Sequence, residues 1–388
     1  MHFLFVKDEL SYPRVSGHDV HTYWMMRSLH EAGHEISLLT VEPSSQPAIE
    51  AIDLKNNLVF SPTAGEDDNQ PGLTRLQKKF CSYWGISNSR IREVANHSRQ
   101  LKADTVVAVG LDVLPYLSLV KDASRVWYAA DEWVIHHLSQ FSPCRPPSWS
   151  NLKHAAVKGL YERAFASVVD RTWLVSDRDA RWARRIMPRT ATDVVPNGVD
   201  TEHYSPQVVT EADRSCVFWG RLDFGPNLDA IEWFCKNVWG EVRSTFVDAK
   251  FTVFGFKPGE AVRQLANKFK FELITDLPDI RQQICAHQVV VLPFVSGAGI
   301  KNKLLEAASL SRPIIASKTA LNGVDTGTRN SIQPASGRRQ WIKTLTQLWD
   351  DQPRRQSLGQ HARAWVMAQH TWPAAAQRVI KNLQTNSE

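Results

Sequence analysis

Short apolar runs alternate along the chain with longer segments whose apolar residues recur every three or four positions. Met1–Val6 is the first such run, and a polar loop follows it at Lys7–Gly17. His18–Ala32 then has the spacing of an amphipathic helix, and Glu35–Val41 is a second buried run. Because strand, loop, helix and strand come in this order, the pattern predicts the start of a parallel, doubly wound sheet.

The alternation continues to the end of the chain. Further strands are predicted at Thr105–Val109, Val126–Ala130, Ser167–Asp170, Thr172–Val175, Cys216–Trp219, Phe251–Phe254, Phe271–Ile274, Val289–Leu292 and Pro313–Ala316. The last helices are expected at Arg338–Trp349, Arg354–Gln369 and Pro373–Leu383. Glu42–Gly72 predicts a long surface loop around one or two short strands, and His137–Asn151 predicts a second irregular segment. The turn cluster Pro196–Asp200 favours a domain linker, so we expect two tandem α/β domains.

Composition excludes several classes of protein. The chain has 388 residues, 43% hydrophobic and 22% charged, as in an ordinary globular protein with two cores. The closest two of its five cysteines, Cys216 and Cys235, are too far apart for a zinc or redox pair, which favours a reducing cytoplasm. The first ten residues are too short and too charged for a signal peptide. No apolar window approaches the ~20 residues of a membrane span.

The net charge of +6 is compatible with anionic partners, and the excess of basic residues is concentrated in two segments. Residues 145–189 hold ten Arg and Lys against four acids, and residues 336–388 hold eight against three. We expect these segments to form one neighbouring zone that binds an anionic membrane surface or a lipid-diphosphate acceptor. The alternative is that they are solvated helix faces that keep the protein soluble.

The segment SGAGIKNKLLEAASL, residues 296–310, carries the most chemistry. Its small residues, which let backbone N–H groups approach an anion at a helix start, are Gly297, Ala298 and Gly299. Lys301 and Lys303 add side-chain cations for a phosphate, and Glu306 is placed to accept hydrogen bonds from ribose hydroxyls. The alternative is a glycine-permitted turn with solvated lysines and a surface glutamate.

A second segment, FWGRLDFGPN, runs from a strand end into a loop and a helix. Arg221 is placed there to contact a diphosphate, and Asn227 is expected to cap the helix. The alternative for Arg221 is a structural ion pair.

Three segments in this order and spacing resemble glycosyltransferase family 4 (glycosyl transferases group 1), retaining enzymes of the GT-B fold. They are VVPNGVDTEHYSP, FWGRLDFGPNLDAIEWF and GAGIKNKLLEAASLSRPIIAS. The segment SGHDVHTYWMMRSLHEAGHEISLLT resembles the family's first β-α-β unit. The resemblance implies two Rossmann-like domains that face each other across a cleft. It assigns the acceptor to residues 1–193 and the nucleotide-sugar donor to residues 194–370, and residues 371–388 to a helix returning to the N-terminal domain.

The resemblance also implies roles for individual residues. Glu306 would bind the donor ribose, while Arg221 and the lysine of GIKNK, Lys303, would neutralise the diphosphate. Gly17 would lie beside the donor phosphates, and Asp276–Asp279 would border the base. Two positions depart from the family pattern: Ala298 stands where a first glutamate is common, and the lysine expected shortly after Arg221 is missing. Lys301 and Lys303 are expected to take over that phosphate charge.

The expected activity is a metal-independent transfer, of hexosyltransferase type, that needs no cofactor. Cations on the leaving diphosphate lower the barrier, and the retaining family is thought to need no protein nucleophile. On the acceptor side Asp112 and Asp131 follow predicted strands and are candidates to assist proton transfer, with capping or surface carboxylates as the alternative. His18, next to Gly17, is a weaker candidate.

The expected partners are a nucleotide-diphosphate sugar and a glycan or lipid-linked acceptor, in cell-surface polysaccharide or glycoconjugate synthesis. The expected location is the cytoplasm, with peripheral contact at the inner face of the membrane. Two alternatives stay open, an epimerase or phosphorylase of the same architecture and a nucleotide-sugar-binding protein without catalysis, which Ala298 favours. Nucleic-acid binding is not expected, because the basic segments match no recognition module.

Overall fold

A computed structural model describes residues 1–12, 17–61, 72–130, 132–141, 143, 146–297, 299–324 and 331–385. The chain divides into two compact units. Unit 1 consists of Met1–Pro196 and Trp372–Glu388, and unit 2 consists of Asn197–Thr371.

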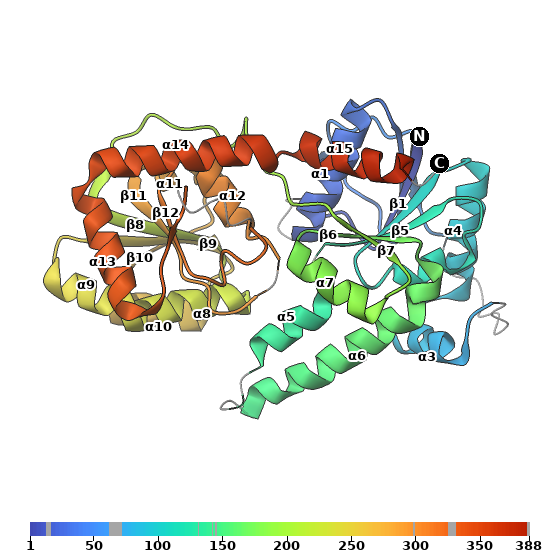
Figure 1. Ribbon diagram of the computed structural model, residues 1–388, viewed down its shortest axis with the longest axis horizontal. Helices are drawn as coiled ribbons and strands as arrows, with labels where there is room; N and C mark the ends of the chain where they lie inside the picture. Colours follow the sequence, from blue (N-terminus) through green and yellow to red (C-terminus); the bar gives the residue numbers. More distant parts are fainter. Residues whose placement is uncertain are drawn as a thin grey trace. The chain divides into compact units, whose positions relative to one another are not determined.

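Unit 1 is built on a parallel seven-stranded sheet with the order β3-β2-β1-β4-β5-β6-β7 (Figure 1). Its strands are β1 (His2–Lys7), β2 (Glu35–Thr40), β3 (Asn56–Val59), β4 (Thr105–Val109), β5 (Ser124–Ala130), β6 (Arg171–Leu174) and β7 (Ala191–Val194). Its helices are α1 (Gly17–Glu31), α2 (Gln46–Ile49), α3 (Arg75–Tyr83), α4 (Asn88–Gln100), α5 (Trp133–Gln140), α6 (Ser150–Phe165), α7 (Asp177–Ile186) and α15 (Trp372–Gln384). The order reverses between β1 and β4, where a doubly wound sheet usually binds its ligand.

The two faces of this sheet have separate cores because side chains alternate along each strand. In β1, Phe3 and Phe5 pack with residues of α1 and α15, whereas Leu4 and Val6 pack with residues of α3, α4, α6 and α7. Figure 1 shows α1 and α15 on one face and α6 and α7 on the other. Residues 372–385 therefore do not join the basic surface of α6 and α7, and the expected single basic zone is wrong for this segment.

Unit 2 holds a parallel six-stranded sheet with the order β10-β9-β8-β11-β12-β13. Its strands are β8 (Ala212–Arg221), β9 (Lys250–Phe256), β10 (Glu272–Thr275), β11 (His287–Leu292), β12 (Ile314–Ala316) and β13 (Gln333–Pro334). Its helices are α8 (Gly225–Phe234), α9 (Gly240–Thr245), α10 (Glu260–Phe269), α11 (Arg281–Cys285), α12 (Asn302–Ser309), α13 (Gly337–Asp350) and α14 (Gln352–Gln369). Helices α12 and α14 pack together on one face, and α8 and α10 cover the other (Figure 1).

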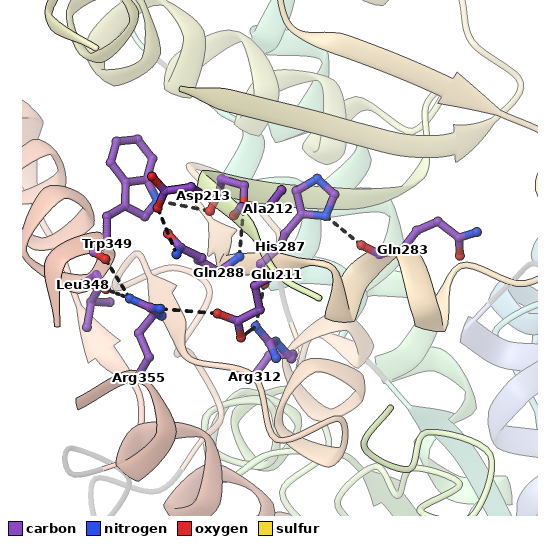
Figure 2. Close-up of polar contacts among 11 residues, drawn as sticks. Glu211, Ala212, Asp213, Gln283, His287, Gln288, Arg312, Leu348, Trp349 and Arg355 are labelled. Carbon is purple, nitrogen blue, oxygen red and sulfur yellow. Dashed lines mark hydrogen bonds and ion pairs between the residues drawn. The ribbon is translucent and has the colours of Figure 1, made fainter. Parts of the chain in front are cut away.

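A polar network joins the amino edge of this second sheet to α13 and α14 (Figure 2). Glu211, just before β8, accepts hydrogen bonds from Arg312 at 2.6 Å and from Arg355 at 3.3 Å. The buried Arg355 also donates to the carbonyls of Leu348 and Trp349, at 2.7 and 2.8 Å, near the end of α13. The network therefore satisfies carbonyls that the helix end leaves without an intrahelical partner.

Most predicted elements are confirmed, and β4 has the predicted bounds. Two predictions are wrong. Ser167–Asp170 is not a strand, because a 3-10 turn at Ala166–Val168 continues the end of α6. The segment 137–151 is not wholly irregular, because α5 extends to Gln140 and α6 begins at Ser150. No helix within the described ranges is both long and apolar enough to span a bilayer.

Candidate active site

The strongest cluster of functional side chains lies at the carboxyl edge of the sheet in unit 2. The strand order reverses between β8 and β11, so the loops after these two strands diverge and leave room for a ligand. Strand β8 ends at Arg221, and β11 leads through Gly297 to the start of α12 at Asn302. Most of the predicted donor residues lie on these two loops and on α12.

Lys303 is held between the end of β8 and the start of α8. Its Nζ donates to Asn227 Oδ1 at 3.2 Å, and Asn227 Nδ2 donates to the Arg221 carbonyl at 2.7 Å. A Cβ on Gly220 would lie 2.5 Å from both Cε and Nζ of Lys303, and Gly220 has φ +143°, which other residues rarely adopt. Only glycine therefore allows this packing of Lys303.

The prediction that Asn227 caps a helix is wrong. Helix α8 begins earlier, at Gly225, with Phe224 in the capping position. The buried side chain of Asn227 instead bridges the β8 carboxyl end and Lys303. Asn227 is thus a site residue whose role the local sequence pattern did not reveal.

The surroundings of Lys303 disfavour its charge. Burial lowers the pKa of Lys303 to about 8, the charge of Glu306 opposes that fall, and the charge of Lys301 adds to it. Its Nζ lies 5.7 Å from the ring centre of Phe218 and 5.8 Å from that of Phe294. An anionic ligand here would favour the charged lysine and gain a strong charge-assisted hydrogen bond.

Glu306 lies on α12, one turn beyond Lys303. Its Oε2 accepts a hydrogen bond from the indole N–H of the buried Trp219 at 2.8 Å. Burial raises the pKa of Glu306, while the indole hydrogen bond opposes that rise. The charge of Glu306, together with burial, raises the pKa of the neighbouring Tyr204. Trp219 therefore orients the carboxylate, a contact between residues far apart in the sequence.

Gly297 and Gly299, which precede α12, both lie in the backbone region that favours glycine. Their φ values are +111° and +66°. A Cβ on Gly297 would lie 2.9 Å from Nζ of Lys301, so this glycine also makes room for a lysine. The partial positive charge of the α12 amino end adds to that of the two lysines. Ala298 lies outside the described residues.

Arg221 and Asp276 lie at the same edge but have other surroundings. Nε of Arg221 is 2.7 Å from Oδ1 of Asp223, and the Arg221 side chain is 38% exposed, so the ion-pair alternative describes its present contact. Asp276 is exposed directly after β10 and has φ +61°. Nearby Asp279 is bound by Arg281, which lowers the pKa of Asp279 to about 2.

The acceptor-side candidates lie at the corresponding edge of the sheet in unit 1. Gly17 begins α1, the ring of His18 stacks on Trp133 with centres 5.8 Å apart, and Asp112 is exposed after β4. The charge of Asp112 raises the pKa of the nearby Lys158, although burial of that lysine lowers it more. Asp131 lies outside the described residues.

Glu132, next to Asp131, caps a helix instead of facing a ligand. Its carboxylate accepts from the N–H groups of Val134 at 3.3 Å and Ile135 at 2.7 Å at the start of α5. Burial raises the pKa of Glu132 and also that of the fully buried Glu162. Glu132 therefore serves as the amino-terminal cap of α5.

The match to a known protein family lies within unit 2. Residues 213–351 match the family model described as glycosyl transferases group 1. No curated protein matches the sequence.

Solved structures match nearly the whole chain. Sucrose-phosphate synthase from Thermosynechococcus elongatus has a TM-score of 0.73 at 12% identity, over 99% of this chain and 98% of that one. HepE from Anabaena, in complex with UDP and glucose, has a TM-score of 0.65 at 12% identity, over 98% and 99%. The pneumococcal O-GlcNAc transferase GtfA, in complex with UDP and GlcNAc, has a TM-score of 0.65 at 10% identity, over 99% of both chains. The chain therefore has the GT-B fold with two Rossmann-like domains, and its residues 213–351 match the model of the glycosyl transferases group 1.

Proposed function

We propose that the protein is a retaining glycosyltransferase that moves a sugar from a nucleotide-diphosphate donor to a hydroxyl acceptor. One observation carries the donor half of this proposal: Lys303, with its lowered pKa, lies beside Glu306 where the strand order of unit 2 reverses. A cation and a carboxylate on one helix suit the diphosphate and the ribose of one nucleotide. HepE and GtfA, which share the fold, were solved with UDP.

The proposed mechanism follows from the charge that develops as the donor breaks. The bond between the sugar carbon and the diphosphate oxygen breaks while the acceptor oxygen forms a bond to the same carbon. The acceptor proton passes to the departing diphosphate on that face. Lys303, Lys301 and Arg221 would neutralise the leaving group, so the reaction is proposed to be metal-independent and to need no cofactor.

The acceptor side is proposed more coarsely. Asp112 and Asp131 are the candidates to bind the acceptor hydroxyl or assist its deprotonation, and Gly17 would border the donor phosphates. The proposed acceptor is a glycan or lipid-linked sugar in cell-surface polysaccharide or glycoconjugate synthesis. The proposed location is the cytoplasm, with peripheral contact at the inner membrane face.

A panel of UDP-, GDP- and ADP-sugars tests this function through binding and slow hydrolysis. We expect one nucleotide class to bind and turn over. Glu306→Ala should weaken donor binding about thirtyfold, since hydrogen bonds to charged groups contribute roughly 1.5–3 kcal/mol. Glu260→Ala, which removes an exposed carboxylate from α10, is the matched control and should bind normally. Binding without turnover would favour the nucleotide-sugar-binding alternative, and absence of binding would refute the proposal.

A further inference from the structure

A shallow apolar groove with a volume of about 460 Å³ lies between α5, α6 and α7 in unit 1. Its apolar walls include Leu138 of α5, Leu152 and Leu160 of α6, and Ile186 of α7. Two arginines, Arg163 and Arg185, also line it. None of the candidate donor or acceptor residues lines this groove.

The apolar surface continues along the outer face of α6. Leu152 and Leu160 are 40% and 59% exposed, and the exposed Ala156 lies between them at helical spacing. Trp149, just before α6, is 57% exposed. Single exposed leucines are ordinary, but several along one helix face beside a groove mark an interaction surface.

The charges around this surface are almost all positive. Six basic residues of α6 and α7 are at least partly exposed and belong to this surface: Lys153, Arg163, Arg178, Arg181, Arg184 and Arg185. Of the carboxylates on the same helices, Glu162 and Asp179 are buried and only Asp177 is exposed. The surface therefore presents apolar side chains and guanidinium groups together, with little acidic charge to neutralise them.

We propose that this surface, formed by α6, α7 and the groove they share with α5, docks on an anionic lipid bilayer. The leucines and Trp149 enter the boundary between headgroups and acyl chains, where tryptophan and aliphatic side chains are stable. The arginines bind lipid phosphates, which match the geometry of their N–H groups. This inference assigns the membrane contact of the proposed function to one surface of unit 1, and it excludes α15, which covers the opposite face of the sheet.

Flotation of the full chain with vesicles tests the proposal. Wild type should float with phosphatidylglycerol-containing vesicles and not with pure phosphatidylcholine vesicles. Arg181→Gln with Arg185→Gln should weaken binding about thirtyfold, because each basic residue near an anionic surface contributes about 1 kcal/mol, or about fivefold. Leu152→Ser with Leu160→Ser should weaken it at least about tenfold, since both apolar side chains lose their burial in the bilayer.

Two matched variants in unit 2 serve as controls. Arg339→Gln with Lys343→Gln removes the same charge from exposed positions of α13, and Val247→Ser with Met367→Ser removes exposed apolar side chains. Both should float like wild type, and all four variants should bind the nucleotide sugar as wild type does. Failure of the donor assay with intact flotation would thus refute only the transferase.

Three results would overturn the docking proposal. Wild type that fails to float with anionic vesicles is the first. Flotation that is unchanged in both surface variants, or equally weakened in the controls, is the second. In the third, wild type is a dimer and does not bind vesicles, and the Leu152 and Leu160 variant is a monomer. The surface would then bind a second copy of the chain.

Discussion

The two edges of the sheet in unit 2 both hold cationic side chains with little exposure, but these cations are paired directly with a carboxylate at only one edge. At the amino edge, one carboxylate, Glu211, pairs with Arg312 and Arg355 within 3.3 Å (Figure 2). At the carboxyl edge, Lys303 donates a hydrogen bond to the side-chain amide of Asn227 at 3.2 Å. Burial lowers the pKa of Lys303 to about 8, and the charge of Lys301 contributes to that fall. The amino edge therefore contributes to stability, whereas the carboxyl edge carries positive charge that an anionic ligand would neutralise.

The largest effect of this difference is expected on stability at the amino edge. Glu211→Ala leaves two arginines of low exposure without their shared carboxylate, so the free energy of unfolding should fall by about 2–4 kcal/mol. Urea denaturation followed by tryptophan fluorescence measures this. The control is Asp248→Ala, which breaks an exposed pair with Arg214 and should change stability by less than about 1 kcal/mol. Equal effects of the two substitutions would contradict the network's role.

At the carboxyl edge, removal of a charge should have the opposite effect on stability. Folding lowers the pKa of Lys303 from 10.5 to about 8, so the folded state disfavours the charged lysine. Lys303→Met should therefore raise the free energy of unfolding by about 1–2 kcal/mol at pH 7, a value reduced for the partial exposure of the side chain. It should also weaken binding of the nucleotide sugar about thirtyfold, because a charge-assisted hydrogen bond is lost.

Calorimetry and denaturation on the same Lys303→Met sample separate this result from simple misfolding. A misfolded variant would lose both affinity and stability, whereas we expect affinity to fall while stability rises. Lys318→Met, which replaces an exposed lysine of unit 2, should change neither quantity. A less stable Lys303→Met protein would show that the lysine is structural.

A substitution at Gly220, on which Lys303 packs, should have a smaller effect on donor binding. A Cβ at residue 220 would lie 2.5 Å from the lysine, so Gly220→Ala should displace Lys303 and weaken donor binding about tenfold or more. Gly225→Ala is the control, because nothing lies within 4 Å of a Cβ there. Titration with the nucleotide sugar checks both variants. Similar affinities of the two variants for the nucleotide sugar would mean that Lys303 can move without weakening donor binding.

The sequence predicts the strands well because a buried parallel strand appears in the sequence as a short run of apolar residues. Thr105–Val109 is such a run, and the structure has a strand with the same bounds. Ser167–Asp170 contains a similar apolar pair and is not a strand, because α6 continues into a 3-10 turn there. Local pattern alone does not distinguish a helix end from a strand start in so short a segment.

The candidate site is predictable in its residue types and not in its contacts. Glycine, lysine and glutamate near a helix start already favour a diphosphate and a ribose. The hydrogen bonds of Asn227 to Lys303 and of Trp219 to Glu306 join residues that are distant in sequence, so no spacing rule reveals them. The structure adds these positioning residues and shows that Gly220 is small because a lysine packs on it.

The charge of Lys303 also makes the carboxyl edge of the sheet sensitive to pH near 8. Below pH 8 the lysine of the free protein is mostly protonated, and as the pH rises through about 8 the charge is lost. A bound diphosphate favours the charged form and raises this pKa, so donor affinity should fall about tenfold between pH 7 and pH 9. The ratio of affinities of wild type and Lys303→Met isolates the lysine, because titration of the ligand affects both proteins equally. That ratio should shrink toward one as the pH rises, and a constant ratio would show that another group supplies the cation.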